Sequence, residues 1–247
     1  MSKWLGLSGK RTLIAGGGGL GAELCAAFLE VGASVFVVDR DADVLKGALE
    51  SCLEHVGGEI ADVSTKAGAD AAVEKAVASL GGLDVLIHAV GINRRQSIVD
   101  IDVESWQLTQ DVNATSFLWL AKADKNHLEG GGRVVAISSV SGTLAHPDHG
   151  SYAASQGALN QLVRVMAVEW AASGIAVNAV APGYIQTPLT EAYLARAGRL
   201  EALVERVPAR RLGEPQDVVG PVLLLASGRS EYVTGQIIYV DGGRTLD

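Results

Sequence analysis

The amino-acid sequence predicts an α/β fold, in which a doubly wound, parallel, seven-stranded sheet is flanked by helices. Short apolar segments alternate with helix-length segments along the whole chain, and this alternation is typical of βαβ units. Of the 247 residues, 30 are Gly and 48% are hydrophobic, which fits a buried sheet with tight turns. Because βαβ crossovers are right-handed, few topologies are open to such a chain, and the doubly wound sheet is favoured among them.

The expected elements follow one another in a regular order. Strands are expected at Arg11–Ala15, Ser34–Asp39, Glu59–Asp62, Asp84–Ala89, Gly132–Ser138, Ala176–Ala181 and Gln236–Val240. Helices are expected at Leu20–Val31, Asp41–Cys52, Thr65–Leu80, Val103–Leu128, Tyr152–Ser173 and Pro215–Ala226. No repeat or Pro/Ser-rich linker interrupts them, so residues 1–247 are assigned to a single domain. Segment 187–207 departs from the rhythm, because it has a helical composition between the last two strands, and we expect it to form a substrate lid.

The composition excludes several classes of function. The formal net charge of −8 argues against nucleic-acid binding, because no cluster of Lys and Arg reverses it locally. Cys25 and Cys52 are the only cysteines, which leaves no disulfide framework, and no His/Cys/Asp spacing predicts a metal site. No segment reaches the roughly 18 apolar residues of a membrane span, and the N-terminus does not resemble a secretory signal. We therefore expect a soluble cytoplasmic protein that acts on a small molecule, with no nucleic-acid or membrane partner.

A glycine-rich loop follows the first expected strand and leads into a helix. Gly16, Gly18 and Gly21 satisfy the pattern Gly-x-Gly-x-x-Gly, with Gly19 and Leu20 between them. Glycines allow a tight turn and a close approach of the backbone to a pyrophosphate, and the helix N-terminus offers N–H groups and a partial positive charge. In this strand–turn–helix context the loop predicts a Rossmann-type dinucleotide site.

The second expected strand ends at Asp39, eighteen residues beyond Gly21, and Arg40 follows it. A carboxylate in this place accepts hydrogen bonds from the adenosine ribose hydroxyls and repels a 2′-phosphate. Asp39 therefore favours NAD over NADP. Arg40 leaves the other cofactor open, because a guanidinium pairs well with a phosphate, and Asp39 also suits the N-cap of the next helix.

Further motifs lie at the ends of the later strands and on the long helices. They are Asp62-Val63, His88-Ala89-Val90-Gly91, Asp111-Val112-Asn113, Ile137-Ser138-Ser139, Tyr152 with Gln156, Pro182-Gly183-Tyr184-Ile185-Gln186-Thr187, and Thr234-Gly235-Gln236 through Val240-Asp241-Gly242-Gly243. Through these motifs the chain closely resembles the short-chain dehydrogenase/reductase family in its compact single-domain form. The resemblance covers essentially all 247 residues.

The resemblance implies an enzyme that interconverts a secondary alcohol and a ketone with a nicotinamide cofactor. Tyr152 takes the place of the family's general acid/base, and Ser139, thirteen residues earlier, would hold the substrate oxygen. Asn113 matches the family's helix asparagine, which would hold a water that connects the site to solvent. Gln156 lies four residues after Tyr152 and therefore on the same helix face.

The resemblance also implies which residues contact the cofactor. Asp62 and Val63 would lie against the adenine, and the segment 182–187 would contact the nicotinamide. With the glycine loop, the cofactor-binding set is Gly16, Gly18, Gly19, Leu20, Gly21, Asp39, Arg40, Asp62, Val63, Ala89, Gly91, Tyr152, Gln156, Pro182, Gly183, Ile185 and Thr187.

Three positions depart from the family pattern. The glycine loop is one residue shorter than usual, with Ala15 in place of a Thr, His88 replaces an Asn, and Gln156 replaces the catalytic Lys. A free tyrosine has a pKa near 10, and a cation a few ångströms away lowers that pKa by about 1 to 3 units. Gln156 carries no charge, although its amide can still reach ribose hydroxyls. We therefore expect slow, alkaline-shifted oxidation, with an NAD-binding pseudoenzyme or a non-redox descendant as the alternative.

The substrate is predicted from the residues around the expected pocket mouth. Arg94 and Arg95 follow the fourth strand in a run that looks like its counterpart in the gluconate 5-dehydrogenase-like branch, whose substrates are sugar acids. Two guanidiniums suit a carboxylate, and they equally suit a solvated or interface role. His146 and Tyr184 are the other candidates for substrate contact. A sugar acid or other hydroxy acid is expected, and a broad carbonyl or ketoacyl reductase is the alternative.

The family resemblance also implies a homotetramer. The long helices expected at Val103–Leu128 and Tyr152–Ser173 would pair between subunits. Trp119 and Trp170, with their apolar neighbours, suit such interfaces, and they suit an ordinary core as well.

Overall fold

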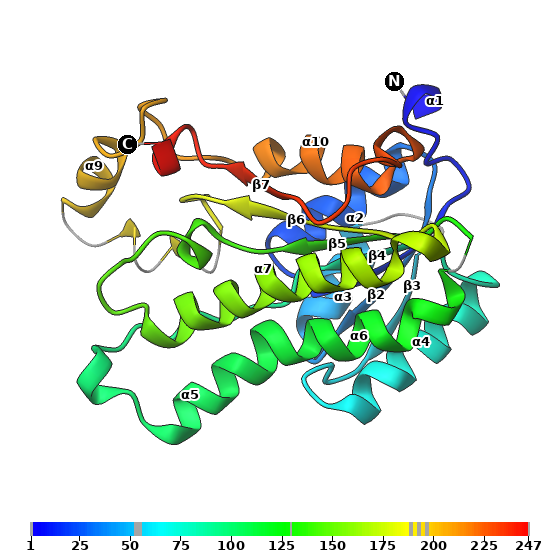
Figure 1. Cartoon of the computed structure of the whole chain (residues 1–247), viewed down its shortest axis with the longest axis horizontal. Coiled ribbons are helices and arrows are strands. Elements are labelled where there is room, and N and C mark those ends of the chain that lie inside the picture. Colours follow the sequence, from blue (N-terminus) through cyan, green and yellow to red (C-terminus); the bar gives the residue numbers. More distant parts are fainter. Residues whose placement is uncertain are drawn as a thin grey trace.

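The computed structural model describes residues 2–51, 56–128, 130–187, 190–191, 194–195 and 198–246. These residues form a seven-stranded sheet in which every neighbouring pair is parallel, in the order β3-β2-β1-β4-β5-β6-β7 (Figure 1). The strands are β1 (Arg11–Ala15), β2 (Ser34–Asp39), β3 (Val56–Ile60), β4 (Val85–His88), β5 (Arg133–Ile137), β6 (Ala176–Pro182) and β7 (Ile237–Val240). The predicted Rossmann-type parallel sheet is confirmed.

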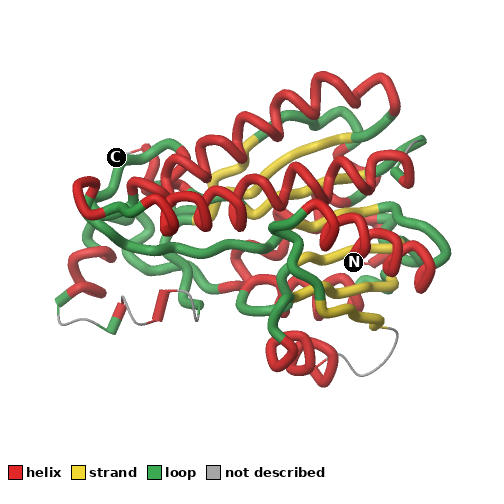
Figure 2. Tube along the Cα trace, turned by 90° about the horizontal axis from the view of Figure 1, so that it is seen from below, coloured by secondary structure: helices red, strands yellow, loops and turns green. Residues whose placement is uncertain are grey.

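Helices cover both faces of the sheet. They are α1 (Ser2–Leu5), α2 (Leu20–Glu30), α3 (Ala42–Ser51), α4 (Lys66–Leu80), α5 (Val103–Gln110), α6 (Ser116–Asp124), α7 (Gly150–Trp170), α9 (Arg199–Val204) and α10 (Pro215–Ala226). One apolar cluster joins the sheet to α4, α6 and α7, and a second joins its other face to α2, α3 and α10. Figure 2, viewed from the side of α4, α6 and α7, shows helices lying over the strands.

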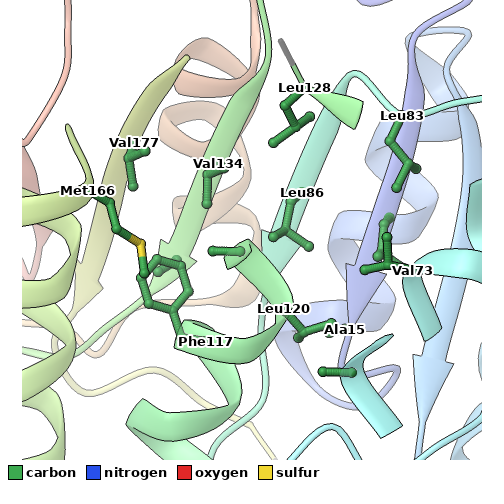
Figure 3. Packing of buried hydrophobic residues seen from close by; sticks show 14 of the residues in the cluster. Ala15, Val73, Leu83, Leu86, Phe117, Leu120, Leu128, Val134, Met166 and Val177 are labelled. Carbon is green, nitrogen blue, oxygen red and sulfur yellow. The ribbon is translucent and has the colours of Figure 1, made fainter. Parts of the chain in front are cut away.

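The alternation of side chains along each strand supplies both clusters. In β1, Leu13 and Ala15 belong to the first cluster and Ile14 to the second, because successive side chains point to opposite faces. Figure 3 shows the first cluster, in which Phe117 of α6 and Met166 of α7 lie over the strands. Across the part of the chain that the structure describes, every helix is too short or too polar to cross a lipid bilayer.

The strand order places a ligand crevice beside β1. From β1 the chain first builds β2 and β3 on one side, and it then returns to build β4 on the other side. In doubly wound sheets the ligand binds outside the carboxyl ends of the strands at this reversal. The glycine loop after β1 and Ala89 after β4 lie here, and the Ala89 amide donates to the Ala15 carbonyl.

Two elements differ from the sequence prediction. Strand β3 begins at Val56 and ends at Ile60, so Asp62 and Val63 follow the strand and do not end it. Its Gly57 lies against Phe36, whose ring would be only 2.7 Å from a Cβ atom at that position. Glycine is normally unfavourable in strands, so the sequence prediction began this strand at Glu59 and missed its first three residues.

The helix expected at Val103–Leu128 is interrupted. A π-helical turn, Asp111–Thr115, separates α5 from α6, and a short 3₁₀ turn, Lys125–His127, ends the segment. The spacing of apolar residues along the sequence does not reveal one extra residue in a helical turn, so a continuous helix was predicted. Of the expected lid at 187–207, residues 188–189, 192–193 and 196–197 lie outside the described residues, and α9 lies in its last part.

Candidate active site

A cavity of about 450 Å³ lies at the carboxyl ends of the strands. It is lined by most of the residues predicted to bind cofactor or to take part in catalysis: Gly16, Gly18, Gly19, Leu20, Asp39, Arg40, Asp62, Val63, Ala89, Gly91, Ser139, Tyr152, Gln156, Pro182, Gly183, Ile185 and Thr187. Gly21, Asn113 and the four predicted substrate residues are not part of this lining. Ser64, Ile92, Val112 and Thr190 also line it, and their only sequence signal was their position beside motif residues.

The glycine loop forms one end of the cavity. Gly16 has a φ of +95°, and a Cβ there would lie 2.8 Å from the carbonyl carbon of Ala89. A Cβ at Gly21 would lie 1.8 Å from the Gly16 oxygen, so this glycine allows α2 to pack against the loop. Gly19, with a φ of +52°, is the N-cap of α2. The backbone at the start of α2 therefore lines the cavity, an arrangement that suits a pyrophosphate.

Asp39 lies at the same end of the cavity. One carboxylate oxygen accepts the Gly17 amide at 2.8 Å and the other accepts the Asp41 amide at 2.9 Å. A carboxylate has about four acceptor sites, so the same oxygens can also receive ribose hydroxyls. Asp62 is oriented by Ser64, whose amide and hydroxyl donate to its Oδ1 at 3.0 and 2.6 Å.

Tyr152 and Ser139 lie at the other end of the cavity. Ser139 follows β5 and caps a short 3₁₀ turn through a 3.1 Å bond from the Ser141 amide to its Oγ. Tyr152 lies in the first turn of α7. Burial raises the pKa of Tyr152, while a hydrogen bond with the Ser139 side chain and the positive charge of Arg95 act in the opposite direction.

Gln156 lies one turn further along α7 and is 3% exposed. It lines the cavity, and its Oε1 has no hydrogen-bond partner among the described residues. A buried, unpaired amide oxygen is unfavourable, and a ribose hydroxyl would satisfy it. This observation, with the glycine loop and Asp39, shows that the residues present fit a dinucleotide.

Asn113 lies in the π-helical turn and is fully buried. Its Oδ1 accepts the Ile92 amide at 2.8 Å, and its Nδ2 donates to the Ile92 carbonyl and to Ser155 Oγ, each at 2.9 Å. Ser155 Oγ in turn donates to the Tyr152 carbonyl at 2.7 Å. The side chain of Asn113 thus joins the loop after β4 to the helix of Tyr152, and both of its amide hydrogens are used within the protein.

His88, at the end of β4, is buried and does not line the cavity. Its Nε2 lies 2.7 Å from Ser116 Oγ, which donates to the Val112 carbonyl, so the imidazole Nε2–H is the donor to Ser116. Burial lowers the pKa of His88 to about 3. A neutral histidine held in this way connects β4 to the π-helical turn that contains Asn113.

The predicted substrate residues lie beyond Tyr152. Ring centroids of His149 and Tyr152 are 6.0 Å apart, those of His146 and His149 are 5.3 Å apart, and those of His146 and Tyr184 are 6.0 Å apart. The structure therefore brings His146 and Tyr184 into one row of rings that ends at Tyr152. Arg95 is half-buried, whereas Arg94 is exposed.

Several positive charges surround this row of rings. Burial, together with the charges of His149, Arg244, Arg95 and Arg206, lowers the pKa of His146 to about 4. Sequence reasoning missed Arg206 and Arg244, which reach the site from the C-terminal part of the chain and belong to no motif. Within the described residues, no three His, Cys, Asp or Glu side chains are grouped as metal ligands would be.

Comparison with known proteins identifies the family. A family model described as enoyl-(acyl carrier protein) reductase matches residues 14–245. The chain is 35% identical to galactitol 2-dehydrogenase (L-tagatose-forming) of Cereibacter sphaeroides over 93% of this chain and 92% of that protein. It is 33% identical to the 5-keto-D-gluconate 5-reductase of Escherichia coli strain K12, over 98% of each chain.

A solved structure shares the fold over almost its whole length. The gluconate 5-dehydrogenase from Burkholderia cenocepacia J2315, in complex with NADP and tartrate, superposes with a TM-score of 0.93 and 33% identity, covering 98% of each chain. Together with the parallel sheet and the Ser139–Tyr152 pair, these matches show that the chain belongs to the short-chain dehydrogenase/reductase family of nicotinamide-dependent oxidoreductases.

Proposed function

We propose that this protein uses NAD(H) to interconvert a secondary alcohol and a ketone on a hydroxy acid related to a sugar. The observation that carries this proposal is the position of the hydrogen-bonded Ser139–Tyr152 pair, which lies in the same cavity as the glycine loop and Asp39. An acid/base hydroxyl and a dinucleotide cradle in one cavity are what hydride transfer to or from a carbonyl carbon requires.

The chain itself handles the proton. When bound, an oxidised nicotinamide would supply the acceptor for the hydride of the alcohol carbon. Ser139 Oγ would hold the substrate oxygen, and Tyr152 Oη would take the proton of the hydroxyl group as the carbonyl forms. In the reverse direction Tyr152 Oη would return that proton to the carbonyl oxygen. Asn113 keeps α7 in place through Ser155 and so positions Tyr152.

Asp39 supports NAD as the cofactor, because its carboxylate lines the cavity at the end of β2 and would repel a 2′-phosphate. The gluconate 5-dehydrogenase that shares this fold was solved with NADP, so the cofactor preference of this chain has to be measured. Arg40, which also lines the cavity and is exposed, is the residue that would favour NADP.

The charges near Tyr152 support a substrate that carries a carboxylate group. Arg95, which is half-buried, is the proposed carboxylate partner, and the ring pair of His146 and Tyr184 and the exposed Arg94 are the other candidates for substrate contact. Relatives named for gluconate and keto-gluconate, and a relative that binds tartrate, are consistent with a hydroxy acid. Two guanidiniums and an uncharged histidine suit a carboxylate with neighbouring hydroxyl groups.

The proposal is tested by titrating the protein with NADH and NADPH through nicotinamide fluorescence, and then by assaying a substrate panel across pH. We expect tighter binding of NADH, turnover of sugar acids or other hydroxy acids, and an oxidation rate that rises toward alkaline pH. Preference for NADPH would contradict the cofactor assignment. Selective turnover of uncharged apolar ketones would contradict the acid substrate and favour a broad carbonyl or ketoacyl reductase.

A second candidate is an NAD-binding protein without turnover, and Gln156 is the observation that favours it. Its neutral amide offers no charge to Tyr152, while its unpaired Oε1 still suits a ribose hydroxyl. NADH binding with no turnover of any substrate in the panel would support this candidate. Turnover gained by Gln156→Lys would instead identify a dehydrogenase weakened at one position.

We also propose a homotetramer, with contacts through α5 and α7. The tryptophans considered from the sequence pack against the core, because Trp170 is buried and Trp119 is partly buried on the first apolar cluster. Other apolar residues of these helices are exposed instead, including Val103, Trp106 and Val168. Size-exclusion chromatography with light scattering tests this, and a monomeric mass at micromolar concentration would contradict it.

A further inference from the structure

Tyr152 needs a positive charge that its own helix does not provide. Burial raises the pKa of its hydroxyl, and at neutral pH that makes the phenolate scarce. Gln156, one turn along α7, carries no charge and is buried with its Oε1 unpaired. Among the protein's own side chains, a cation that stabilises the phenolate therefore has to come from another part of the chain.

The loop after β4 places an arginine beside the start of α7. At one end of this loop, Ile92 is held by two hydrogen bonds with Asn113. At the other end, the Gln96 amide donates to the Asp148 carbonyl at 3.1 Å, and Gln96 forms a parallel bridge with His149. Arg95 stands between these anchors, directly before the residue that is bridged to the N-cap of α7.

The two arginines of this loop differ in exposure. Arg95 is half-buried while its neighbour Arg94 is exposed. The Arg95 charge lowers the pKa of three groups, Tyr152, His149 and His146. The rings of these three residues are neighbours, with centroids 6.0 and 5.3 Å apart, so the charge of Arg95 acts on one connected group of side chains.

The polar groups that face Tyr152 come from three elements. Ser139, after β5, contributes a hydrogen bond, His149, at the start of α7, contributes a ring, and Arg95, after β4, contributes a charge. Burial, together with the charge of Arg95, lowers the pKa of His149, which keeps that ring neutral near pH 7. Among the described residues, Arg95 is thus the cation that acts on Tyr152.

We propose that Arg95 is the residue that stabilises the phenolate of Tyr152, in place of a cation at position 156. The inference rests on the proposed function only in assigning Tyr152 as the base. In alcohol oxidation the phenolate oxygen accepts the proton of the substrate hydroxyl, and the guanidinium, which exchanges no proton, favours the charged form of the base before that transfer. A guanidinium suits this role because it remains protonated at any pH at which the enzyme works.

The direct test is a titration of Tyr152 in the folded protein without cofactor or substrate. Tyrosines labelled with ¹³C are followed by NMR against pH, and the signal of Tyr152 is identified by its loss in Tyr152→Phe. Arg95→Met should raise the titration midpoint by about one pH unit, because a nearby opposite charge lowers such a pKa by about 1 to 3 units. Arg95→Lys should keep the midpoint close to that of the unmodified protein.

Arg94→Met is the matched control, because it removes the same charge from the adjacent, exposed position. It should leave the midpoint of Tyr152 within a few tenths of a unit. An unchanged midpoint in Arg95→Met would overturn the proposal, and so would an equal shift in Arg94→Met. Circular dichroism across the same pH range verifies that each variant stays folded, and Arg95→Gln replaces Arg95→Met if that variant does not fold.

A second experiment, the pH dependence of kcat, distinguishes an effect of Arg95 on Tyr152 from a role of Arg95 in substrate binding. If Arg95 acts on Tyr152, Arg95→Met shifts the ascending limb of the kcat–pH profile for alcohol oxidation to higher pH, and adding Gln156→Lys moves that limb back to lower pH. A raised KM with an unmoved kcat profile would show that Arg95 only binds substrate, and it would overturn the proposal. Absence of turnover in the unmodified protein would count against the proposed function alone, because the tyrosine titration needs no turnover.

Discussion

The two ends of the cavity differ in how their polar groups are paired. At the adenosine end, both carboxylate oxygens of Asp39 accept backbone amides, and Asp62 is held by Ser64. At the catalytic end, Gln156 Oε1 is buried without a hydrogen-bond partner among the described residues, and the same holds for Nε2 of His146, which lies beyond Tyr152 and outside the cavity lining. The first end is thus organised by the protein alone, whereas the second keeps polar atoms available for a ligand.

This difference follows from where the neighbouring groups come from. The adenosine end is built from the residues that directly follow β1, β2 and β3, and their conformation is set by turns and by glycine sterics. The catalytic end collects side chains from the loop after β4, the end of β5 and the start of α7. Its electrostatics therefore depend on approaches between distant segments, and substitutions there should change chemistry more than cofactor binding.

The largest expected effect is at the catalytic end. Tyr152→Phe removes the hydroxyl that we propose exchanges a proton with substrate, and general acid–base catalysis typically contributes about 10²- to 10⁴-fold in rate. We expect kcat to fall by that factor while the Kd for NADH, measured by fluorescence, changes less than about threefold. If Tyr152→Phe keeps most of its activity, the chemistry does not depend on this hydroxyl, and the division into a catalytic end and an adenosine end is wrong.

A buried carboxyl outside the cavity provides a contrast for the unpaired atoms of the catalytic end. Asp124, on α6, is fully buried, and neither of its carboxyl oxygens has a hydrogen-bond partner among the described residues. Burial raises its pKa to about 7 from the ordinary aspartate value of 3.8. The folded state therefore binds more protons than the unfolded state between these values, and stability should fall as pH rises from about 4 to 7.

Asp124→Asn should remove this pH dependence, which is on the order of 3 kcal/mol in the free energy of unfolding between pH 5 and pH 8. Denaturant unfolding at pH 5 and pH 8 measures it, and NADH binding should be unaffected because Asp124 does not line the cavity. An unfolding free energy with the same pH dependence in both proteins would contradict the raised pKa. A change in NADH affinity would contradict the separation from the cavity.

At the adenosine end, Asp39→Asn tests cofactor choice. The amide keeps an acceptor for a backbone N–H but removes the negative charge that repels a 2′-phosphate. We expect the ratio of the Kd values for NADPH and NADH to fall about tenfold, which is roughly 1.4 kcal/mol, with little change in the kcat for NADH. A ratio that does not move would show that Asp39 only orders the glycine loop.

The smallest expected effect concerns His146 at the edge of the catalytic end. Its pKa is lowered to about 4 from 6.5, chiefly by burial, so the unfolded state binds more protons than the folded state in this window. Stability is then lost as pH falls from about 6.5 to 4. In His146→Asn the drop in Tm between pH 7 and pH 4.5 should be a few degrees smaller than in the unmodified protein. Thermal unfolding at the two pH values measures it. An equal drop in both proteins would show that other groups cause the loss of stability in acid.

Much of the adenosine end could be predicted before the structure. The spacing of Gly16, Gly18 and Gly21, and the position of Asp39 at the end of a strand, follow rules that act between near neighbours in the chain. The structure places all but Gly21 on the cavity, and Gly21 packs against Gly16 directly behind it. Strand β3 was displaced in the prediction because only the packing of Gly57 against Phe36 makes a glycine suitable there.

The catalytic end was predicted in its residues but not in its environment. Ser139, Tyr152 and Gln156 lie together on the cavity, as their spacing indicated. The π-helical turn around Asn113 and the approach of Arg95 to Tyr152 had no sequence signal. Helical periodicity does not register one extra residue in a turn, and no local pattern shows which loop will lie beside a helix.

By itself, the sequence determined the parallel sheet, the glycine loop and most of the side chains that line the cavity, because apolar periodicity, glycine sterics and motif spacing act over short stretches of chain. Only the tertiary structure decided which charges act on Tyr152 and which buried polar atoms lack a partner. Burial and Coulomb interactions depend on distances in space between segments far apart in the chain.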